Sequence, residues 1–171
     1  MSLTFILGGA RSGKSSFALE LAKDKETVVF IATALPLDEE MKERIERHKR
    51  ERPSHWKTIE EPVGLLSLME GLDVEVIILD CLTMWVSNLL ERYTDEEIIE
   101  IAEGVARYAR DINSEVIALS NEVGLGIVPE YPIGRRYRDL LGRVNQIFAK
   151  YASKVFFMIA GIPLEVKNES K

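Results

Sequence analysis

The stretch Gly8-Gly9-Ala10-Arg11-Ser12-Gly13-Lys14-Ser15 decides the fold, and it follows directly on the apolar run Leu3-Thr4-Phe5-Ile6-Leu7. It is a GxxxxGKS pattern between a predicted strand and a predicted helix, the context of a phosphate-binding loop. The glycines allow a tight turn whose N–H groups point at phosphate oxygens, and the helix that follows presents the positive end of its dipole. Lys14 is expected to reach the β and γ phosphates, and Ser15 to bind Mg²⁺ through its hydroxyl. An ordinary glycine-rich turn is the alternative, but the order of strand, loop, Lys-Ser and helix favours a nucleoside triphosphate site.

Length and composition limit the class of protein. The 171 residues suffice for one domain with a substantial core, so we expect a single nucleotide-binding domain over residues 1–171. A net charge of −6 and a pI near 5.1 argue against the broad basic surface of a nucleic-acid binder. Cys81 is the only cysteine, which excludes an internal disulfide framework and fits a reducing compartment. No apolar run approaches the roughly 20 residues of a membrane span, and the apolar start is typical of a strand and not of a signal peptide. We therefore expect a cytoplasmic protein without a membrane span.

Short β-branched runs alternate with helical patterns, which is typical of a parallel sheet covered by helices. The predicted strands are residues 3–7, 28–33, 74–80, 115–120 and 154–160. The predicted helices are residues 13–24, 38–51, 62–70, 82–92, 94–111 and 135–152. Gly161-Ile162-Pro163 then turns the chain into residues 164–166, a candidate antiparallel edge strand, and residues 168–171 are expected to fray. The predicted fold class is α/β, with a mostly parallel sheet in a three-layer phosphate-loop arrangement.

The predicted strand that ends at Asp80 supplies a carboxylate at the same edge of the sheet as the phosphate loop. We expect Asp80 to organise the Mg²⁺ shell, because phosphate-loop proteins hold the metal with the loop Ser or Thr and an Asp from a second strand. Any parallel strand can end in Asp, so this signal depends on its pairing with Lys14 and Ser15. Together they predict a phosphate-loop NTPase or kinase and leave the acceptor open.

The helix predicted after the second strand carries His48 in basic surroundings. Asp38 is a good N-cap and Pro53 a good stop, and the helical spacing places His48 on the face that docks toward the body. From this pattern alone, a packed histidine or a solvated basic helix is the simpler interpretation. The chemistry favours a different one, since a neutral imidazole can attack phosphorus and nearby cations can neutralise the transferring group. Those cations are Lys49, Arg50 and Arg52. His55, the other histidine, is expected in a packed turn.

Several segments, in the same order, resemble one family. They are GGARSGKSSFALELA at residues 8–22, the region at residues 31–62, DCLTMWVSNLL at residues 80–90, SNEVGLGIVPEYPIGRRYRDLLGRVNQ at residues 120–146 and AGIPLEVK at residues 160–167. The phosphate loop is shared by many proteins, whereas RIxxHxxxRPxxW and SNEVGxGIVP are specific. The chain resembles the bifunctional adenosylcobinamide kinases and adenosylcobinamide-phosphate guanylyltransferases of cobalamin biosynthesis. It departs from the family pattern at Ser153, where an aspartate is expected, and at Arg47, where some members carry a histidine.

The resemblance implies a fold similar to the RecA-like ATPases, a homotrimer, and two reactions on a corrinoid substrate. ATP or GTP phosphorylates the aminopropanol hydroxyl of adenosylcobinamide, and GMP is then transferred from GTP through a covalent GMP-histidine, giving adenosylcobinamide-GDP and pyrophosphate. It implies that His48 is the guanylylated residue, that Lys14 and Asp80 are catalytic, and that Ser15 and Asp80 hold Mg²⁺, partly through water. The implied nucleotide contacts are Gly8, Gly9, Ala10, Arg11, Ser12, Gly13, Lys14, Ser15, Thr33, Ala34, Leu35, Lys49, Arg50, Glu51, Arg52, Glu60 and Leu82.

Other residues near the predicted site keep alternative interpretations. The long loop from Asn121 to Gly134 is predicted to be functional, and Asn121 or Glu122 is expected to orient a hydroxyl, a water or the metal, or else to fix the loop. Trp56 and Trp85 can line an apolar corrinoid, although Trp85 is expected to pack in the core. A basic cluster begins the next predicted helix. It is expected to contact a corrinoid phosphate or a neighbouring subunit, or else to form a solvated helix face. Its members are Arg135, Arg136 and Arg138.

Base preference and the nature of the acceptor are the least determined features. The guanine-reading Asn-Lys-x-Asp motif is absent, so guanine preference rests on the resemblance. A small-metabolite kinase would share the loop and Asp80 but form no covalent nucleotide. A nucleotide-switched binding module would bind a partner differently in its di- and triphosphate forms. In the two-reaction scheme His48 is dispensable for the kinase step.

Overall fold

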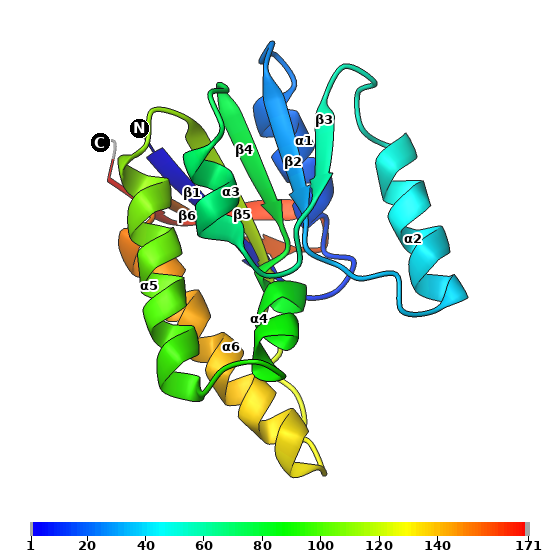
Figure 1. The fold of residues 1–171 in the computed structure, drawn as a ribbon, viewed down its shortest axis with the longest axis vertical. Helices are drawn as coiled ribbons and strands as arrows, with labels where there is room; N and C mark the ends of the chain where they lie inside the picture. Colours follow the sequence, from blue (N-terminus) through cyan, green and yellow to red (C-terminus); the bar gives the residue numbers. More distant parts are fainter. Residues whose placement is uncertain (1, 170–171) are drawn as a thin grey trace.

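The computed structural model describes residues 2–169, which contain a seven-stranded sheet in the order β3-β2-β4-β5-β1-β6-β7 (Figure 1). The parallel strands are β1 Ser2–Gly8, β2 Val28–Ala32, β3 Lys57–Glu60, β4 Val76–Asp80, β5 Glu115–Asn121 and β6 Lys154–Ile159. The last strand, β7 Ile162–Asn168, pairs antiparallel with β6 after a turn in which Gly161 has φ 82°. The α/β class with a mostly parallel sheet and an antiparallel edge strand is confirmed.

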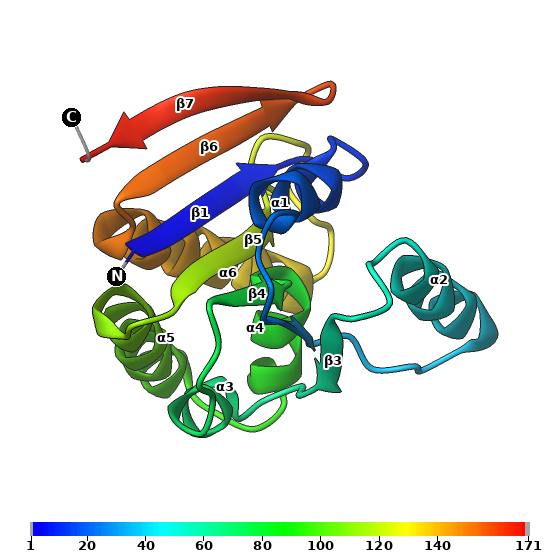
Figure 2. The ribbon, with the colours of Figure 1, turned by 90° about the horizontal axis from the view of Figure 1, so that it is seen from above.

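Helices cover the two faces of the sheet unequally. The helices are α1 Lys14–Ala22, α2 Glu39–Arg50, α3 Leu65–Glu70, α4 Leu82–Leu90, α5 Asp95–Asp111 and α6 Pro132–Tyr151. One face packs against α3, α4, α5 and α6, and the other against α1 (Figure 2). Neighbouring strand residues point to opposite faces, so Phe5 packs on the four-helix side and Ile6 on the α1 side. None of the helices in residues 2–169 has the length and apolarity needed to cross a membrane.

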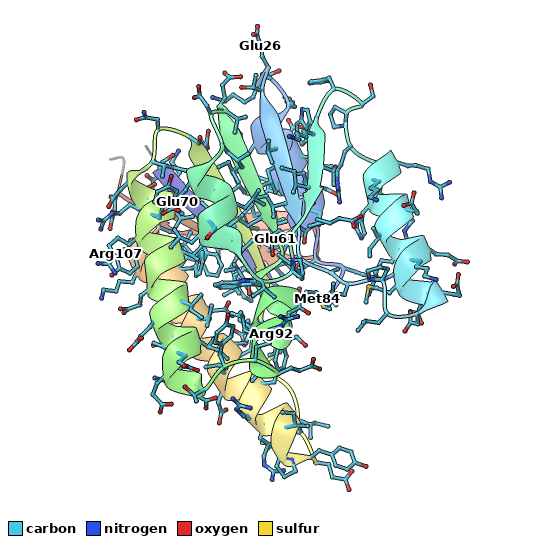
Figure 3. All side chains as sticks on the ribbon, viewed as in Figure 1. Glu26, Glu61, Glu70, Met84, Arg92 and Arg107 are labelled. Carbon is cyan, nitrogen blue, oxygen red and sulfur yellow. The ribbon has the colours of Figure 1, made fainter. Side chains whose placement is uncertain are left out.

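The predicted strands and helices all occur, with shifts at their ends. Helix α3 begins at Leu65 and not at residue 62, because Glu61 holds a turn before it (Figure 3): its Oε1 accepts hydrogen bonds from the N–H groups of Val63 at 2.9 Å and Gly64 at 2.7 Å. Helix α6 begins at Pro132, earlier than residue 135, since proline is tolerated in the first turn of a helix.

Other elements also differ from the prediction at their ends, and helix α1 stops at residue 22 and not at 24. Helix α4 stops at residue 90 and not at 92, β4 begins at residue 76 and not at 74, and β7 is longer than the predicted 164–166. Asn168, where fraying was expected to begin, is still paired in β7. The rest of that expectation falls in part on Ser170 and Lys171, which lie outside the described residues.

Strand β3 is not predicted from the sequence. Lys57-Thr58-Ile59-Glu60 pairs parallel with β2, with Ala32 opposite Glu60. Four residues at the edge of a sheet are too few for an alternation pattern to stand out. The strand matters for the site, because it carries Glu60 to the edge of the sheet where the phosphate loop also lies.

Helix α2 stands apart from the body, beyond the β3 edge (Figures 1 and 2). None of its residues is buried. Asp38 caps it as predicted, since its Oδ1 accepts a hydrogen bond from the N–H of Met41 at 2.7 Å. Because α2 adds nothing to the core, polar contacts near its C-terminal end set its position.

Candidate active site

The phosphate loop lies between β1 and α1, and its glycines meet steric requirements. A Cβ on Gly8 would lie 2.7 Å from Ser12 Oγ, and Gly13 has φ 96°, a conformation that other residues rarely adopt. Lys14 Nζ donates hydrogen bonds to the carbonyl oxygens of Gly9 at 2.6 Å and Gly8 at 3.2 Å. The ammonium group therefore lies over the loop, where it can meet phosphate oxygens.

Ser15 and Asp80 come together from distant parts of the chain. Ser15 Oγ donates to Asp80 Oδ2 at 3.4 Å. Burial raises the pKa of the Asp80 carboxyl, and positive charge on His48, Arg52 and Lys14 opposes this shift. Burial also lowers the pKa of Lys14. The loop and the strand carboxylate thus form one site in which cations surround a half-buried acid.

The oxygen donors at this point suit a small hard cation. A hydroxyl and a carboxylate are ligands that Mg²⁺ accepts, and Mg²⁺ completes its shell with phosphate oxygens and waters. Within residues 2–169 no group of three or more His, Cys, Asp and Glu side chains is arranged to hold a metal. A cation at Ser15 and Asp80 would therefore depend on the nucleotide for its other ligands.

Thr33 fixes the backbone beside Asp80. Its hydroxyl donates to the carbonyl oxygen of Cys81 at 2.7 Å and accepts from the N–H of Cys81 at 2.9 Å, and its own N–H donates to the carbonyl oxygen of Asp80 at 3.0 Å. Asn88 Nδ2 donates to the Thr33 carbonyl oxygen at 2.8 Å. Because Thr33 is fully buried, its side chain holds Asp80 in place and does not face a ligand. Leu82 is also fully buried, which leaves only its backbone for a nucleotide contact.

His48 lies on the half-buried side of α2, as its helical spacing predicted. Its side chain is 36% exposed, and its Nδ1 lies 3.4 Å from Glu51 Oε2. The end of α2 that carries His48 is attached to β3 through Lys49 and Glu60, and in the sheet β3 lies two strands from Asp80 of β4. His55 is exposed and lies edge-on to the buried Trp56, with ring centroids 6.4 Å apart.

Lys49 and Arg52 attach α2 to the sheet. Lys49 Nζ lies 3.0 Å from Glu60 Oε1 at the end of β3, and this hydrogen bond raises the pKa of Lys49. The Arg52 guanidinium lies 3.4 Å from the ring centroid of Phe30, and its Nη1 donates to Thr58 Oγ1 at 3.1 Å. Burial lowers the pKa of Arg52. Three of the implied nucleotide contacts, Lys49, Arg52 and Glu60, therefore also position the helix that carries His48.

Several of the remaining implied nucleotide contacts are exposed or half-buried. Ala10 and Arg11 are exposed at the tip of the phosphate loop, and Ala34 and Leu35 are half-buried just after β2. Arg50 is exposed on α2, where its Nε donates to the carbonyl oxygen of residue 46.

A buried polar network at the end of β5 is not predicted from the sequence. Ser120 Oγ donates to Asn145 Oδ1 at 2.6 Å, and Asn145 Nδ2 donates to the carbonyl oxygen of Asn121 at 3.3 Å. The N–H of Asn121 donates to Thr83 Oγ1 at 2.8 Å, and the Tyr137 hydroxyl donates to the Thr83 carbonyl oxygen at 3.0 Å. These residues come from α4, β5 and α6, so their only sequence signal is a strand that ends in polar residues.

The loop after β5 is held by its own side chains. Glu122 Oε1 accepts a hydrogen bond from the N–H of Gly124 at 2.6 Å, which is the loop-fixing alternative for this residue. Arg135 and Arg138 donate to carbonyl oxygens of the same loop, and Arg136 forms an ion pair with α5. The basic cluster thus stabilises the loop in addition to facing solvent.

Both tryptophans are buried, which limits their use as a lining for a corrinoid. Trp85 is fully buried and its Nε1 donates to the carbonyl oxygen of Val63 at 2.8 Å, so it packs in the core as predicted. Trp56 is 6% exposed, and its Nε1 has no hydrogen-bond partner among residues 2–169.

The sheet order, the loop after β1 and the carboxylate at the end of β4 define a phosphate-loop nucleotide-binding protein. Solved structures with a similar fold include a protein of Pyrococcus horikoshii OT3, with TM-score 0.58 and 8% identity over 98% of this chain and 86% of that chain. The RadB recombinase has TM-score 0.50 and 16% identity over 91% of this chain and 73% of that chain. At these identities the similarity concerns the fold alone.

Sequence comparison places the chain within that class. The family described as "Cobinamide kinase / cobinamide phosphate guanyltransferase" matches residues 4–166. The bifunctional adenosylcobalamin biosynthesis protein CobP of Pseudomonas aeruginosa is 40% identical over 167 residues, 96% of each chain. The proteins of that description called CobU are 38% identical in Escherichia coli K12 and 37% in Salmonella typhimurium, over 96% of this chain and 99% of theirs. The chain belongs to this family and is a bifunctional cobinamide kinase and cobinamide-phosphate guanylyltransferase of cobalamin biosynthesis, as its motifs predicted.

Proposed function

We propose that the two activities share one nucleotide site and that, in the second reaction, His48 carries GMP from GTP to the acceptor. ATP or GTP phosphorylates the aminopropanol hydroxyl of adenosylcobinamide, and GTP then supplies GMP to the adenosylcobinamide phosphate by way of GMP-His48. The observation that carries this proposal is geometric. Lys49 and Arg52 hold the end of α2 with the half-exposed His48 against β3 and β2, next to β4, where Asp80 lies 3.4 Å from Ser15 of the phosphate loop. Nucleophile, metal carboxylate and phosphate loop therefore serve the same triphosphate.

In the guanylyl step, His48 forms a bond from nitrogen to the α phosphorus of GTP. The bond from the α phosphorus to its bridging oxygen breaks, and pyrophosphate leaves with the electron pair. Lys14 over the loop and Arg52 beside Asp80 offset the negative charge that develops. A phosphate oxygen of the acceptor then attacks the same phosphorus, the P–N bond breaks, and free His48 returns. Two easier steps replace one difficult step.

The kinase step uses the same loop in another way. The acceptor hydroxyl attacks the γ phosphorus in line, the bond from this phosphorus to its bridging oxygen breaks, and the nucleoside diphosphate leaves with the electron pair while the hydroxyl proton passes to solvent. The protein contributes positioning and charge and forms no covalent bond. His48 lies on α2, outside the loop, and has no role in this step. Mg²⁺ fits the hydroxyl of Ser15 and the carboxylate of Asp80, and when bound it would neutralise phosphate oxygens.

We further propose a homotrimer in the cytoplasm, with residues 1–171 acting as one domain. One sheet carries both halves of the nucleotide site, which supports the single domain. The free thiol of Cys81 fits a reducing compartment. The trimer is supported by the family resemblance and by large apolar side chains exposed on the loop before α6 and in its first turn. These are Leu125, Ile127, Val128, Tyr131 and Ile133.

Labelling with GTP tests the covalent step. After incubation with Mg²⁺ and GTP labelled at the α phosphate, the denatured enzyme should carry an acid-labile, alkali-stable label. The His48→Ala variant should carry none and still phosphorylate adenosylcobinamide, whereas the His55→Ala control should label like the wild type. An unlabelled wild type, or a label that persists in His48→Ala, would remove GMP-His48 from the scheme.

A further inference from the structure

The end of β5 lies between the two halves of the nucleotide site. Strand β5 pairs with β1, which leads into the phosphate loop, and with β4, which ends at Asp80 (Figure 2). In this register Leu119 lies opposite Asp80, and Asn121 lies opposite Gly8. Asn121 therefore reaches past the metal carboxylate, to the level at which the phosphate loop begins.

The alternation of β5 places the Asn121 side chain on the face of the loop and of Asp80. Ile117 and Leu119 pack in the cluster that contains α1 residues, whereas Ser120 bonds to α6 on the other face. Successive strand residues point to opposite faces, so Asn121 follows Ile117 and Leu119. Its amide is thus on the side of the sheet where α1 and the phosphate loop lie.

The backbone of Asn121 is anchored, and its amide group is not. Its N–H donates to Thr83 and its carbonyl oxygen accepts from Asn145, while the next N–H, of Glu122, donates to the Gly8 carbonyl oxygen at 3.0 Å. Within residues 2–169, no group forms a hydrogen bond with the half-buried side-chain amide of Asn121.

The two side chains that anchor the Asn121 backbone, Thr83 and Asn145, are polar groups buried in the core. Thr83 and Asn145 are at most 7% exposed, and buried polar groups are tolerated only when they are hydrogen-bonded. Their hydrogen bonds hold the backbone at the end of β5, so the Asn121 amide keeps its place on the face of the sheet where the phosphate loop lies. A donor on a fixed backbone needs little reorganisation to meet a transferring phosphoryl group.

We propose that Asn121 Nδ2 donates a hydrogen bond to the terminal phosphoryl group of the bound triphosphate and positions it for transfer to the acceptor hydroxyl. The inference rests on the proposed shared nucleotide site and adds a residue specific to the kinase step. The γ phosphorus is the reacting centre in that step only. In the guanylyl step the γ phosphate belongs to the leaving pyrophosphate, away from the phosphorus that His48 attacks.

Steady-state and binding measurements on Asn121→Ala separate a role in the kinase step from a role in the guanylyl step. For a hydrogen bond to a charged group, we expect the kinase kcat to fall by roughly 10- to 100-fold. GMP-His48 formation at saturating GTP should keep its rate, with a higher GTP concentration for half-saturation, because only uniform binding is lost. Affinity for a non-hydrolysable triphosphate should fall, and affinity for the diphosphate should not. Asn121→Asp should be slower than Asn121→Ala in the kinase step, because its carboxylate repels the phosphoryl group.

Asn113→Ala is the matched control, since Asn113 is an exposed asparagine just before the other end of β5. It should behave like the wild type in every assay. If Asn121→Ala keeps the wild-type kinase kcat, or lowers the kcat of both steps equally, the proposal is wrong. An Asn121→Asp variant as active as the wild type overturns it too. A wild type that forms no GMP-His48 refutes the proposed function instead, and the kinase and triphosphate-binding results still decide the role of Asn121.

Discussion

At the scale of single residues, Asp80 combines two opposed demands. In the proposed site its ionised carboxylate holds Mg²⁺, yet burial raises its pKa, so keeping it ionised lowers the stability of the folded protein. We expect Asp80→Asn to raise the free energy of unfolding without Mg²⁺ by about 1 kcal/mol at neutral pH, and so to raise the unfolding temperature. Both activities of the variant should fall roughly 100-fold.

The pH dependence of that stability difference has a defined sign. Below the ordinary pKa of an aspartate, Asp80 is protonated in the folded and unfolded states, so the substitution brings no advantage. As pH rises through the raised pKa of folded Asp80, the wild type loses stability relative to Asp80→Asn. Thermal unfolding between about pH 4 and pH 8 measures this. A variant that is no more stable than the wild type at any pH contradicts the prediction.

The surroundings of His48 predict which of its nitrogens carries GMP. Nδ1 lies 3.4 Å from the Glu51 carboxylate, which can accept its proton in a hydrogen bond and leave Nε2 as the nucleophile. We therefore expect the phosphoramidate at Nε2. Proton–phosphorus correlation spectra of the labelled protein distinguish the two positions, and attachment at Nδ1 would rule out this role of Glu51.

At the scale of elements, α2 is held by its ends and not by a core. Removing its cap with Asp38→Ala should destabilise the helix by about 1 kcal/mol and slow GMP-His48 formation, while the unfolding temperature and the kinase step stay unchanged. Hydrogen exchange of α2 amides and the labelling rate measure this.

The control is Thr94→Ala, which removes the capping box of α5, a helix with buried residues. It should lower the unfolding temperature and leave the labelling rate of the folded enzyme unchanged. Equal effects of the two substitutions on labelling would show that α2 is not a separate unit.

At the scale of the whole molecule, large apolar side chains lie exposed between β5 and α6. Ile127 is 97% exposed, and such groups together mark an interaction surface. We expect sedimentation to give about three times the 19.4 kDa mass of one chain. Ile127→Asp should lower that mass without changing the far-ultraviolet spectrum, since this side chain is almost fully exposed in the single chain. A trimer that persists in the variant places the interface elsewhere.

Much of the fold can be predicted from the sequence because it depends on local patterns. Every parallel strand except β3 is marked by an apolar, β-branched run, and the phosphate loop by Gly8 and Gly13 at positions that favour glycine. Strand β3 was missed, since four residues carry too little periodicity. The ends of α3 and α6 shifted because Glu61 and Pro132 act through hydrogen bonds and backbone geometry that a hydrophobic pattern does not record.

The sequence by itself determined the class of fold, the phosphate loop and the carboxylate of Asp80 at a strand end, since each is a residue type in a local context, and its resemblance to a family proposed His48 as the nucleophile. Only the tertiary structure decided which other residues position these groups. Thr33 forms a hydrogen bond with the Cys81 backbone beside Asp80. Arg52 stacks on Phe30 and holds α2, and β5 places Asn121 between β1 and β4. These roles depend on contacts between residues far apart in the chain, and such contacts exist only once the sheet has brought its strand ends together.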